Sequence, residues 1–185
     1  NIPSGKTIIG VKGKSIINCL SGVRYGINLG SSNDIRLQDF TLKGISPNTP
    51  VSTGMNPVLP GIIDSYQDAI NLVNIGNQTG IRLNGGEKIV INGLEIINFS
   101  EFGFHVSRTG KKYQYSLNFQ DNYIHDNYCG IKTDLEAERS FYTDNYVTIN
   151  QIGMYIDSGT NDIKGMSLNA NRVGMVLSNG LNHAH

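Results

Sequence analysis

Several short segments of this sequence carry a chemically active side chain two positions after a glycine. These side chains are Arg82, His105, Lys132 and Tyr155. A second set, four positions after the same glycines, comprises Asn84, Ser107, Asp134 and Asp157. Successive side chains of a strand point to opposite faces, so the third and fifth residues of each segment leave the core while the second and fourth enter it. The pattern therefore predicts one outward surface that carries both sets.

Five of these side chains suit acid–base catalysis. If Asp134 and Asp157 stack on neighbouring strands, their carboxylates repel, and we expect the pKa of one of them to rise and provide a general acid. Lys132 or His105 would serve as the base. Tyr155 would act as an acid or as a platform on which a sugar stacks.

The other three would bind substrate. The Arg82 guanidinium is suited to the carboxylate of a uronic or sialic acid, with Asn84 and Ser107 beside it. Two alternatives remain open for the same surface. The Asp134 and Asp157 pair could bind a hard cation such as Ca²⁺ through oxygen, although no metal ligand set is assigned. The whole surface could also be polar only because it is solvated, with Lys132 and Asp134 neutralising one another.

The glycine-led segments recur along the chain, which indicates a repeat architecture. They begin at Gly26, Gly80, Gly103, Gly130, Gly153 and Gly174. From Gly80 onward the spacings are 23, 27, 23 and 21 residues, and the first gap is 54, about two periods. We therefore expect the later glycines to lie in one row at strand spacing, with Ile81, Phe104, Ile131, Met154 and Met175 stacked in the core.

Two further sequence features recur with the same period as the glycines. Pairs of apolar residues five positions apart bracket a residue that favours a bend, and these bend residues are Asp39, Gly93, Asp121, Asp144 and Gly165. Asn127, Asn150 and Asn171 each stand three residues before a glycine, whereas Phe99 occupies that region in the preceding unit. Stacked inward asparagines can bond to the next turn of the chain. His125, Thr148 and Asn169 form a second outward column, a weaker site candidate.

The repeat of about 22 residues decides between architectures. It is too short for a βαβ unit, and the leucine signature of leucine-rich repeats is absent. Stacked coils of parallel strands fit best, with an antiparallel β-sandwich as the rival. Residues 44–79 interrupt the period with four of the five prolines, which predicts a loop excursion, with residues 68–72 returning as a strand.

Composition excludes some functions. Lys plus Arg and Asp plus Glu number 15 each, so the basic excess of a nucleic-acid binder is missing. No apolar run is long enough to span a membrane. The 22 glycines and 22 asparagines favour short strands and tight turns. Cys19 and Cys129 are far apart in sequence and are expected to be separate thiols, which leaves the redox compartment open.

Three stretches near the N-terminus resemble the opening turns of pectate-lyase-like proteins: "GKTIIGVKGKSII", "YGINL" and "NDIRLQDFTLKG". The later Asn-x-x-Gly-Ile units are similar to the general repeat of that superfamily. The resemblance implies an all-β, right-handed, single-stranded parallel β-helix that covers residues 1–185 as one domain. The Trp-Ile-Asp-His and Arg-x-Pro-x-x-Arg signatures are absent, as is an Asp-Asp pair with a Gly-His-Gly partner, so pectate cleavage itself is not expected.

What the resemblance implies about function is broader. The group includes lyases, hydrolases, epimerases and the trimeric tailspikes of bacteriophages. We expect a polysaccharide as partner, with a lyase or hydrolase acting on an acidic glycan. The alternative is a non-catalytic β-helix that binds a glycan or has a structural role. The setting would be extracellular or virion-associated, and the chain would either associate as a homotrimer or remain a monomer. The chain begins without Met and shows no end cap, which predicts a piece of a longer protein.

Overall fold

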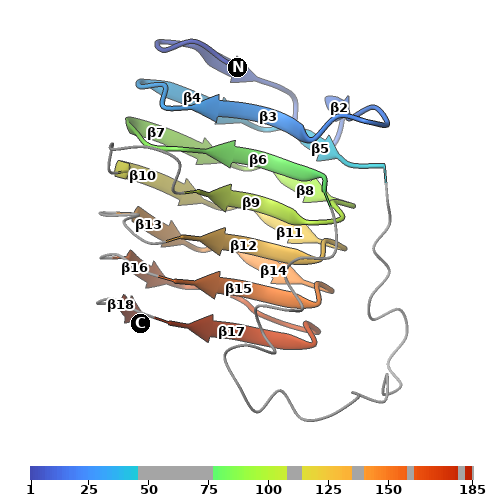
Figure 1. The fold of residues 1–185 in the computed structure, drawn as a ribbon, viewed down its shortest axis with the longest axis vertical. Coiled ribbons are helices and arrows are strands. Elements are labelled where there is room, and N and C mark those ends of the chain that lie inside the picture. Colours follow the sequence, from blue (N-terminus) through green and yellow to red (C-terminus); the bar gives the residue numbers. More distant parts are fainter. Residues whose placement is uncertain (46–76, 108–113, 135–139, 158–160, 179–181, 185) are drawn as a thin grey trace.

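The computed structural model describes residues 1–45, 77–107, 114–134, 140–157, 161–178 and 182–184 (Figure 1). These residues form eighteen β-strands and no helix, so none of them forms an apolar helix that could cross a membrane. The strand expected at residues 68–72 lies outside the described residues. Cys19 and Cys129 are both buried free thiols, as expected.

The strands form three parallel sheets, here called A, B and C. Sheet A contains, in order, β1 (Thr7–Ile9), β4 (Ile35–Gln38), β7 (Gly86–Asn92), β10 (Gln114–Gln120), β13 (Ser140–Thr143), β16 (Asn161–Lys164) and β18 (Asn182–Ala184). Sheet B contains β2 (Ile16–Asn18), β5 (Thr41–Lys43), β8 (Glu95–Ile97), β11 (Tyr123–His125) and β14 (Tyr146–Thr148). Sheet C contains β3 (Tyr25–Gly30), β6 (Thr79–Leu83), β9 (Phe102–Val106), β12 (Cys129–Thr133), β15 (Ile152–Ile156) and β17 (Val173–Leu177).

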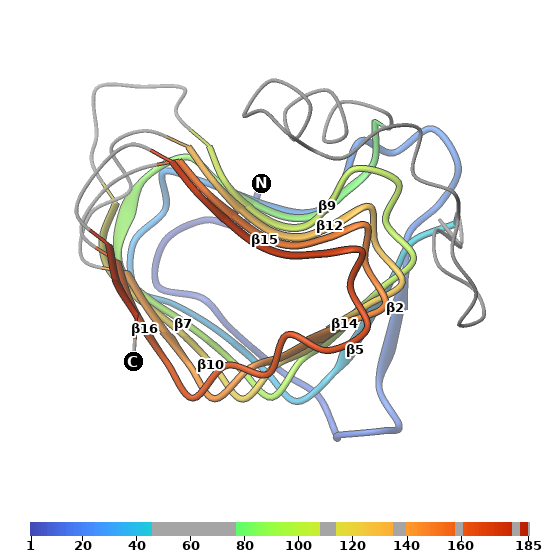
Figure 2. The same ribbon diagram turned by 90° about the horizontal axis from the view of Figure 1, so that it is seen from below.

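The chain visits the sheets in turn, and each strand pairs in parallel with the strand one circuit away. We call one circuit a rung. Viewed along the stack, the strands of each sheet superpose around a common interior, and sheet C bows toward it (Figure 2). This all-parallel arrangement is compatible with a parallel β-helix. Because β3 pairs directly with β6, Gly26 and Gly80 belong to neighbouring rungs although 54 residues separate them. Most of the predicted excursion, residues 46–76, lies outside the described residues.

The glycine row of sheet C follows from the close approach of successive rungs. The predicted stacking is confirmed, because Ile81, Phe104 and Ile131 are register partners. A side chain on Gly103 would place its Cβ 2.8 Å from the carbonyl oxygen of Gly130. A side chain on Gly153 would come within 2.5 Å of the next carbonyl in the row. Any other residue would push the rungs apart, which explains the repeat.

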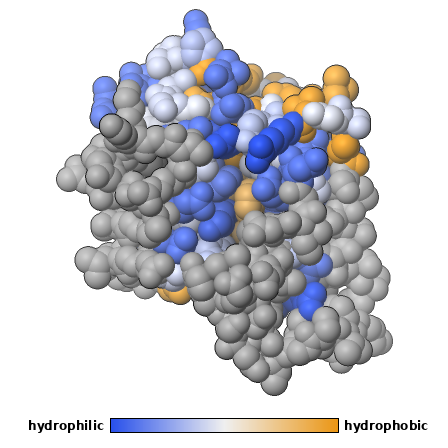
Figure 3. Space-filling model, in the orientation of Figure 1, coloured by the Kyte–Doolittle hydropathy of each residue, from blue (hydrophilic) through white to orange (hydrophobic). Residues whose placement is uncertain are grey.

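The core lies between the three sheets and is filled by apolar side chains that point inward from the strands of each rung. Ile81, Phe104, Ile131 and Met154 are fully buried, whereas Met175 in the last paired strand of sheet C is only partly buried. Each such side chain contributes about 1.5–3 kcal/mol when it is removed from water. At the other end, large apolar side chains such as Leu20, 72% exposed, remain on the surface. Figure 3 shows hydrophobic atoms gathered at that N-terminal end.

The expected bend after the sheet A strands is present in five rungs. Asp39, Gly93, Asp121, Asp144 and Gly165 all have positive φ, between 53° and 67°. This left-handed region is open to glycine and is tolerated by aspartate, whose short polar side chain bonds locally. The bend redirects the chain within two residues, so β4, β7, β10 and β13 each lead directly into a strand of sheet B.

Two asparagine ladders connect the rungs inside the turns. The expected ladder runs through Asn127, Asn150 and Asn171, and the Oδ1 of Asn150 accepts from the backbone N–H of Asn127 at 3.0 Å. At its start, the backbone N–H of Phe99 bonds to Asn127. Sequence analysis did not identify the second ladder, in which the backbone N–H of Asn122 bonds to Asn145. Each amide satisfies buried backbone groups that water cannot reach.

The ladder predicts a stability effect at Asn150. Leucine there has a similar volume but leaves the N–H of Asn127 and the carbonyls of Ile124 and Thr148 without these partners. We expect Asn150→Leu to lower the free energy of unfolding by about 3 kcal/mol, because buried polar groups lose their bonds.

The matched control is Asn169→Leu, since Asn169 is exposed and bonds to the Ser167 hydroxyl. Its effect should be below about 0.5 kcal/mol. Urea unfolding of both variants measures the difference, and equal losses in the two would contradict the assigned role of the ladder.

Candidate functional site

The outward face of sheet C brings the sequence-predicted side chains together. Arg82 pairs with His105 and His105 with Lys132, so three basic groups occupy adjacent rungs in one register column. Tyr155 follows Lys132 in the same column. The structure therefore places the predicted third-position column as expected. The second column lies beside it, and backbone bonds place Asp134 and Asp157 on successive rungs.

Asp134 is the centre of this surface. One carboxylate oxygen lies 3.0 Å from Nε2 of His105, and the other lies 3.1 Å from Nζ of Lys132. The Asp134 side chain is 29% exposed, and those of His105 and Lys132 are more buried. Burial alone would raise the pKa of Asp134. The hydrogen bond and charge of His105, together with Lys132, outweigh burial and lower the pKa to about 2.

This result corrects one expectation. We expected repulsion between Asp134 and Asp157 to raise the pKa of one of them and create a general acid. Asp134 instead turns toward two basic neighbours, so it is ionised at neutral pH and cannot donate a proton there. Its carboxylate can orient the imidazole of His105 and the ammonium of Lys132. A cation would have to compete with these groups, and no group of three or more His, Cys, Asp or Glu side chains among the described residues could hold a metal ion.

Arg82 is held between two rungs by polar and aromatic contacts. Its guanidinium lies 4.8 Å from the ring centroid of Tyr25 on the preceding rung and donates to the Tyr25 hydroxyl. Its Nε donates to Ser107 Oγ at 3.1 Å, and that hydroxyl donates to Asn84. The three predicted binding residues therefore form one connected group. Such contacts fix the direction of a long side chain before any ligand arrives.

Tyr155 does not lie as expected for a sugar platform. Nζ of Lys132 is 3.8 Å from its ring centroid, and the Tyr155 side chain is only 1% exposed. It belongs to a second apolar cluster outside the main core, with Phe102, Tyr128, Cys129 and Ile152. Sequence analysis did not identify this cluster. The available signal was the apolar residue immediately before several of the glycines, but strict alternation along the strand assigns that position to the main core.

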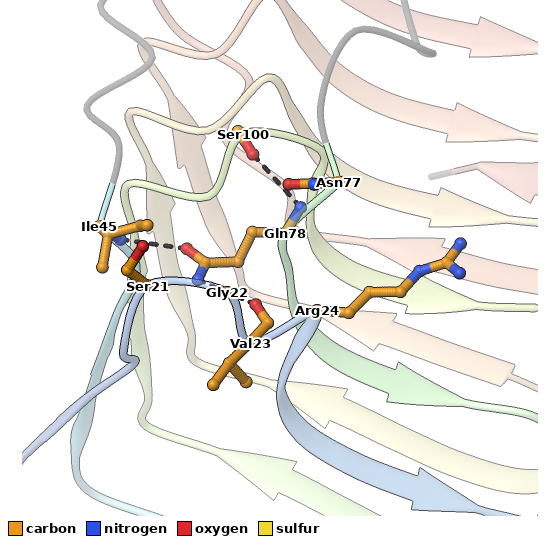
Figure 4. A pocket seen from close by; sticks show the side chains of 8 residues that line it. All are labelled: Ser21, Gly22, Val23, Arg24, Ile45, Asn77, Gln78 and Ser100. Atoms are coloured by element: carbon orange, nitrogen blue, oxygen red, sulfur yellow. Dashed lines mark hydrogen bonds between the residues drawn. The ribbon is translucent and has the colours of Figure 1, made fainter.

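A cavity of about 540 Å³ lies beside the point where the excursion leaves sheet B and returns to sheet C. Figure 4 shows its lining, with Ile45 and Asn77 at the two ends of the excursion. Gln78 crosses it: the backbone N–H of Ile45 bonds to its Oε1, and its Nε2 donates to the carbonyl of Val23, both at 3.1 Å. Gln78 is buried and ties three segments together, which is a structural role. Sequence analysis did not identify this cavity.

Comparisons of the sequence with models of known families and with curated proteins, and of the fold with solved structures, found no match.

The contacts of Asp134 predict a pH-dependent contribution to stability. The pKa of Asp134 is lower in the folded protein than its ordinary value of 3.8, so its ionised form stabilises the fold above that value. The contribution is lost as the pH falls toward about 2. We expect Asp134→Asn to lower the free energy of unfolding by about 1–2 kcal/mol at pH 7, and the difference from the original protein to shrink in acid.

Urea unfolding between neutral pH and the acid limit measures this change. Asp162→Asn is the matched control, because Asp162 is exposed on β16 of sheet A. A loss in Asp134→Asn that stays constant across the pH range would contradict the ion-pair account.

Proposed function

We propose that this chain is a right-handed, single-stranded parallel β-helix, and that the outward face of sheet C binds an extended acidic polysaccharide. The three parallel sheets and their strand order support the fold. The pectate-lyase-like stretches near the N-terminus support the same architecture and a carbohydrate partner. The surface that would bind is defined by Arg82, His105 and Lys132, with Asn84 and Ser107 beside Arg82.

The observation that carries this proposal is the register of the three basic groups. Arg82, His105 and Lys132 repeat at the strand spacing of roughly 4.8 Å along the stack. That spacing is comparable to the length of one sugar unit, so a polymer that runs along the stack would meet one group per rung. An anionic polymer would therefore meet a basic side chain on each of these three rungs, and Coulomb attraction would favour its binding.

Arg82 is the strongest candidate for contact with a sugar carboxylate. A guanidinium presents paired N–H donors that match the two oxygens of a carboxylate. Lys132 and His105 share Asp134, which holds the Lys132 ammonium and the His105 ring in place and compensates the charge of Lys132. We therefore expect Arg82 to contribute more to affinity than either of the other two.

Replacing Arg82 tests the binding proposal. The probes are polygalacturonate, alginate, hyaluronan and polysialic acid, with neutral dextran for comparison, in affinity electrophoresis and calorimetry. We expect at least one acidic polymer to bind in a salt-dependent manner, and dextran to bind less. Arg82→Ala should weaken binding about tenfold, the loss of one charge-assisted contact.

Arg36→Ala is the control, because Arg36 is an exposed arginine on β4 of sheet A whose Nε donates to Gln38. It should leave the affinity unchanged. If none of the acidic polymers binds, or if both variants lose the same affinity, the outward face of sheet C is not the binding surface.

One contact favours cleavage as a second candidate function. Asp134 accepts a hydrogen bond from His105 and would orient the ring, as an ionised carboxylate does for a catalytic histidine. In a lyase reaction, His105 would remove the proton from the carbon atom that is bonded to the carboxyl group of a uronic acid. The electrons of that C–H bond form a C=C bond as the glycosidic C–O bond breaks, and the leaving oxygen takes a proton. Lys132 or Arg82 would stabilise the carboxylate while charge develops on it.

If the protein cleaves the polymer, each glycosidic bond that breaks produces a new chain end. The unsaturated product of a lyase absorbs ultraviolet light, whereas a hydrolase produces reducing ends without it. We expect His105→Ala to reduce the rate about a hundredfold, because general base catalysis is lost, while polymer binding persists. The control variant Arg36→Ala, which changes an exposed residue of sheet A, should retain the full rate. Absence of both products from every bound polymer would leave the binding function alone.

The setting of this function is part of the same proposal. A location outside the cell or on a virion is supported by the resemblance to polysaccharide-active β-helix proteins. Association as a homotrimer is supported by the resemblance to bacteriophage tailspikes.

A further inference from the structure

A second cluster of polar and aromatic side chains lies on the outward face of sheet B. Thr41, Glu95 and Tyr123 are register partners on three successive rungs, and Tyr146 continues the column. His125 lies two residues after Tyr123 on the same strand, in the adjacent outward column. Thr41, Glu95 and Tyr123 line a cavity of about 220 Å³. The cavity lies on a different sheet from Arg82, His105 and Lys132.

A network of hydrogen bonds fixes Glu95 at this cavity. One oxygen of Glu95 accepts from the Thr41 hydroxyl at 2.7 Å, and the other lies 3.1 Å from Nε2 of His125. Nδ1 of His125 lies 2.7 Å from a carboxylate oxygen of Asp126. Burial would raise the pKa of Glu95, but the bonds from Thr41 and His125 outweigh it and lower the pKa. Glu95 is therefore an ionised acceptor with a fixed orientation.

Tyr123 supplies an aromatic wall. One face of its ring stacks on His125, with 4.0 Å between the ring centroids and 25° between the planes. The Tyr123 side chain nevertheless remains 37% exposed, although it is a large apolar group. Because Tyr123 keeps this exposure while it stacks on the buried His125, part of its ring can contact another flat, partly apolar surface. The C–H face of a sugar ring is such a surface.

The remaining lining residues define the chemistry of the occupant. Asp121 adds a second carboxylate, and Lys12, with Gly13, approaches from the loop between β1 and β2. Carboxylates accept hydrogen bonds from neighbouring hydroxyl groups, and the lysine donates to them. Two carboxylates disfavour an acidic ligand, and Lys12 disfavours a cationic one. A neutral, hydroxyl-rich ring satisfies all of these groups.

The size of the cavity limits the occupant further. A volume of about 220 Å³ is smaller than the roughly 300 Å³ at which pockets for drug-sized ligands begin. It is several times larger than the volume that one water molecule occupies in the liquid, about 30 Å³. One monosaccharide unit fits between these limits, whereas a longer oligosaccharide would extend past Tyr123 toward Tyr146. The two tyrosine ring centroids are 5.4 Å apart.

We propose that this cavity on sheet B is a binding site for a neutral monosaccharide unit, with the ring stacked on Tyr123 and its hydroxyl groups bonded to Glu95, Asp121 and Lys12. The site does not depend on the function proposed for sheet C. It would let the protein hold a neutral sugar on one face while an acidic polymer lies on another.

The test uses the whole chain and the methyl glycosides of glucose, galactose, mannose, N-acetylglucosamine and rhamnose. Saturation-transfer NMR detects binding, and titration gives the affinity. We expect at least one glycoside to bind with a Kd in the millimolar range, as a single sugar ring with few contacts does. Its C–H protons should receive the strongest transfer. Tyr123→Ala should weaken this binding at least tenfold.

Two further variants make the result specific. Glu95→Gln keeps the shape of the side chain but removes its charge, so it should also weaken binding several-fold. Tyr146→Ala is the matched control, because Tyr146 is a similarly exposed tyrosine that does not line the cavity, and it should change the affinity less than twofold. Thermal unfolding of each variant checks that the fold is retained.

The outcomes separate this site from the one on sheet C. Arg82→Ala should bind the glycoside as the original protein does, and Tyr123→Ala should still bind an acidic polymer if sheet C binds one. The inference is overturned if no methyl glycoside binds. It is also overturned if binding is unaffected by both Tyr123→Ala and Glu95→Gln, or if ethanolamine binds in place of the glycosides.

Discussion

The fixed register between rungs is the constraint on which the rest of this structure depends. Parallel pairing places equivalent residues of the repeat beside one another at strand spacing. Two features hold that spacing in the described rungs. The glycine row lets the sheet C strands approach closely, and the asparagine ladders bond the turns from inside. An asparagine amide has both donors and an acceptor, so one side chain can satisfy the rung on either side of it.

The same register determines the chemistry of the surface. Whatever residue type occupies an outward position is brought next to its counterparts from the neighbouring rungs. On sheet C this brings Arg82, His105 and Lys132 into one column, and Asp134 is the group that compensates part of their charge. The low pKa of Asp134 is a consequence of that crowding. On sheet B the register instead aligns Thr41, Glu95 and Tyr123 around a cavity.

The repeat in the sequence predicted much of this arrangement. The glycine spacing, the bend residues and the alternation of apolar residues indicated parallel strands and the membership of each column. Side-chain partners were less predictable, because a carboxylate such as Asp134 can turn to the rung above, to the rung below or to its own strand. The sequence offered Asp157 or Lys132 as its partner; in the structure it contacts Lys132 and also His105. The contact between Glu95 and His125 spans two rungs and depends on rotamers that periodicity does not specify.

Hydrogen exchange of the asparagine side-chain amides tests the role of the ladders most directly. NMR can follow the amide protons of Asn122, Asn127, Asn145 and Asn150 individually, with the exposed Asn169 as an internal reference. If the ladders hold the rungs in register, these four should exchange as slowly as the core backbone amides, through opening of the whole stack. Exchange of all four at the rate of Asn169, while the core backbone stays protected, would contradict the account.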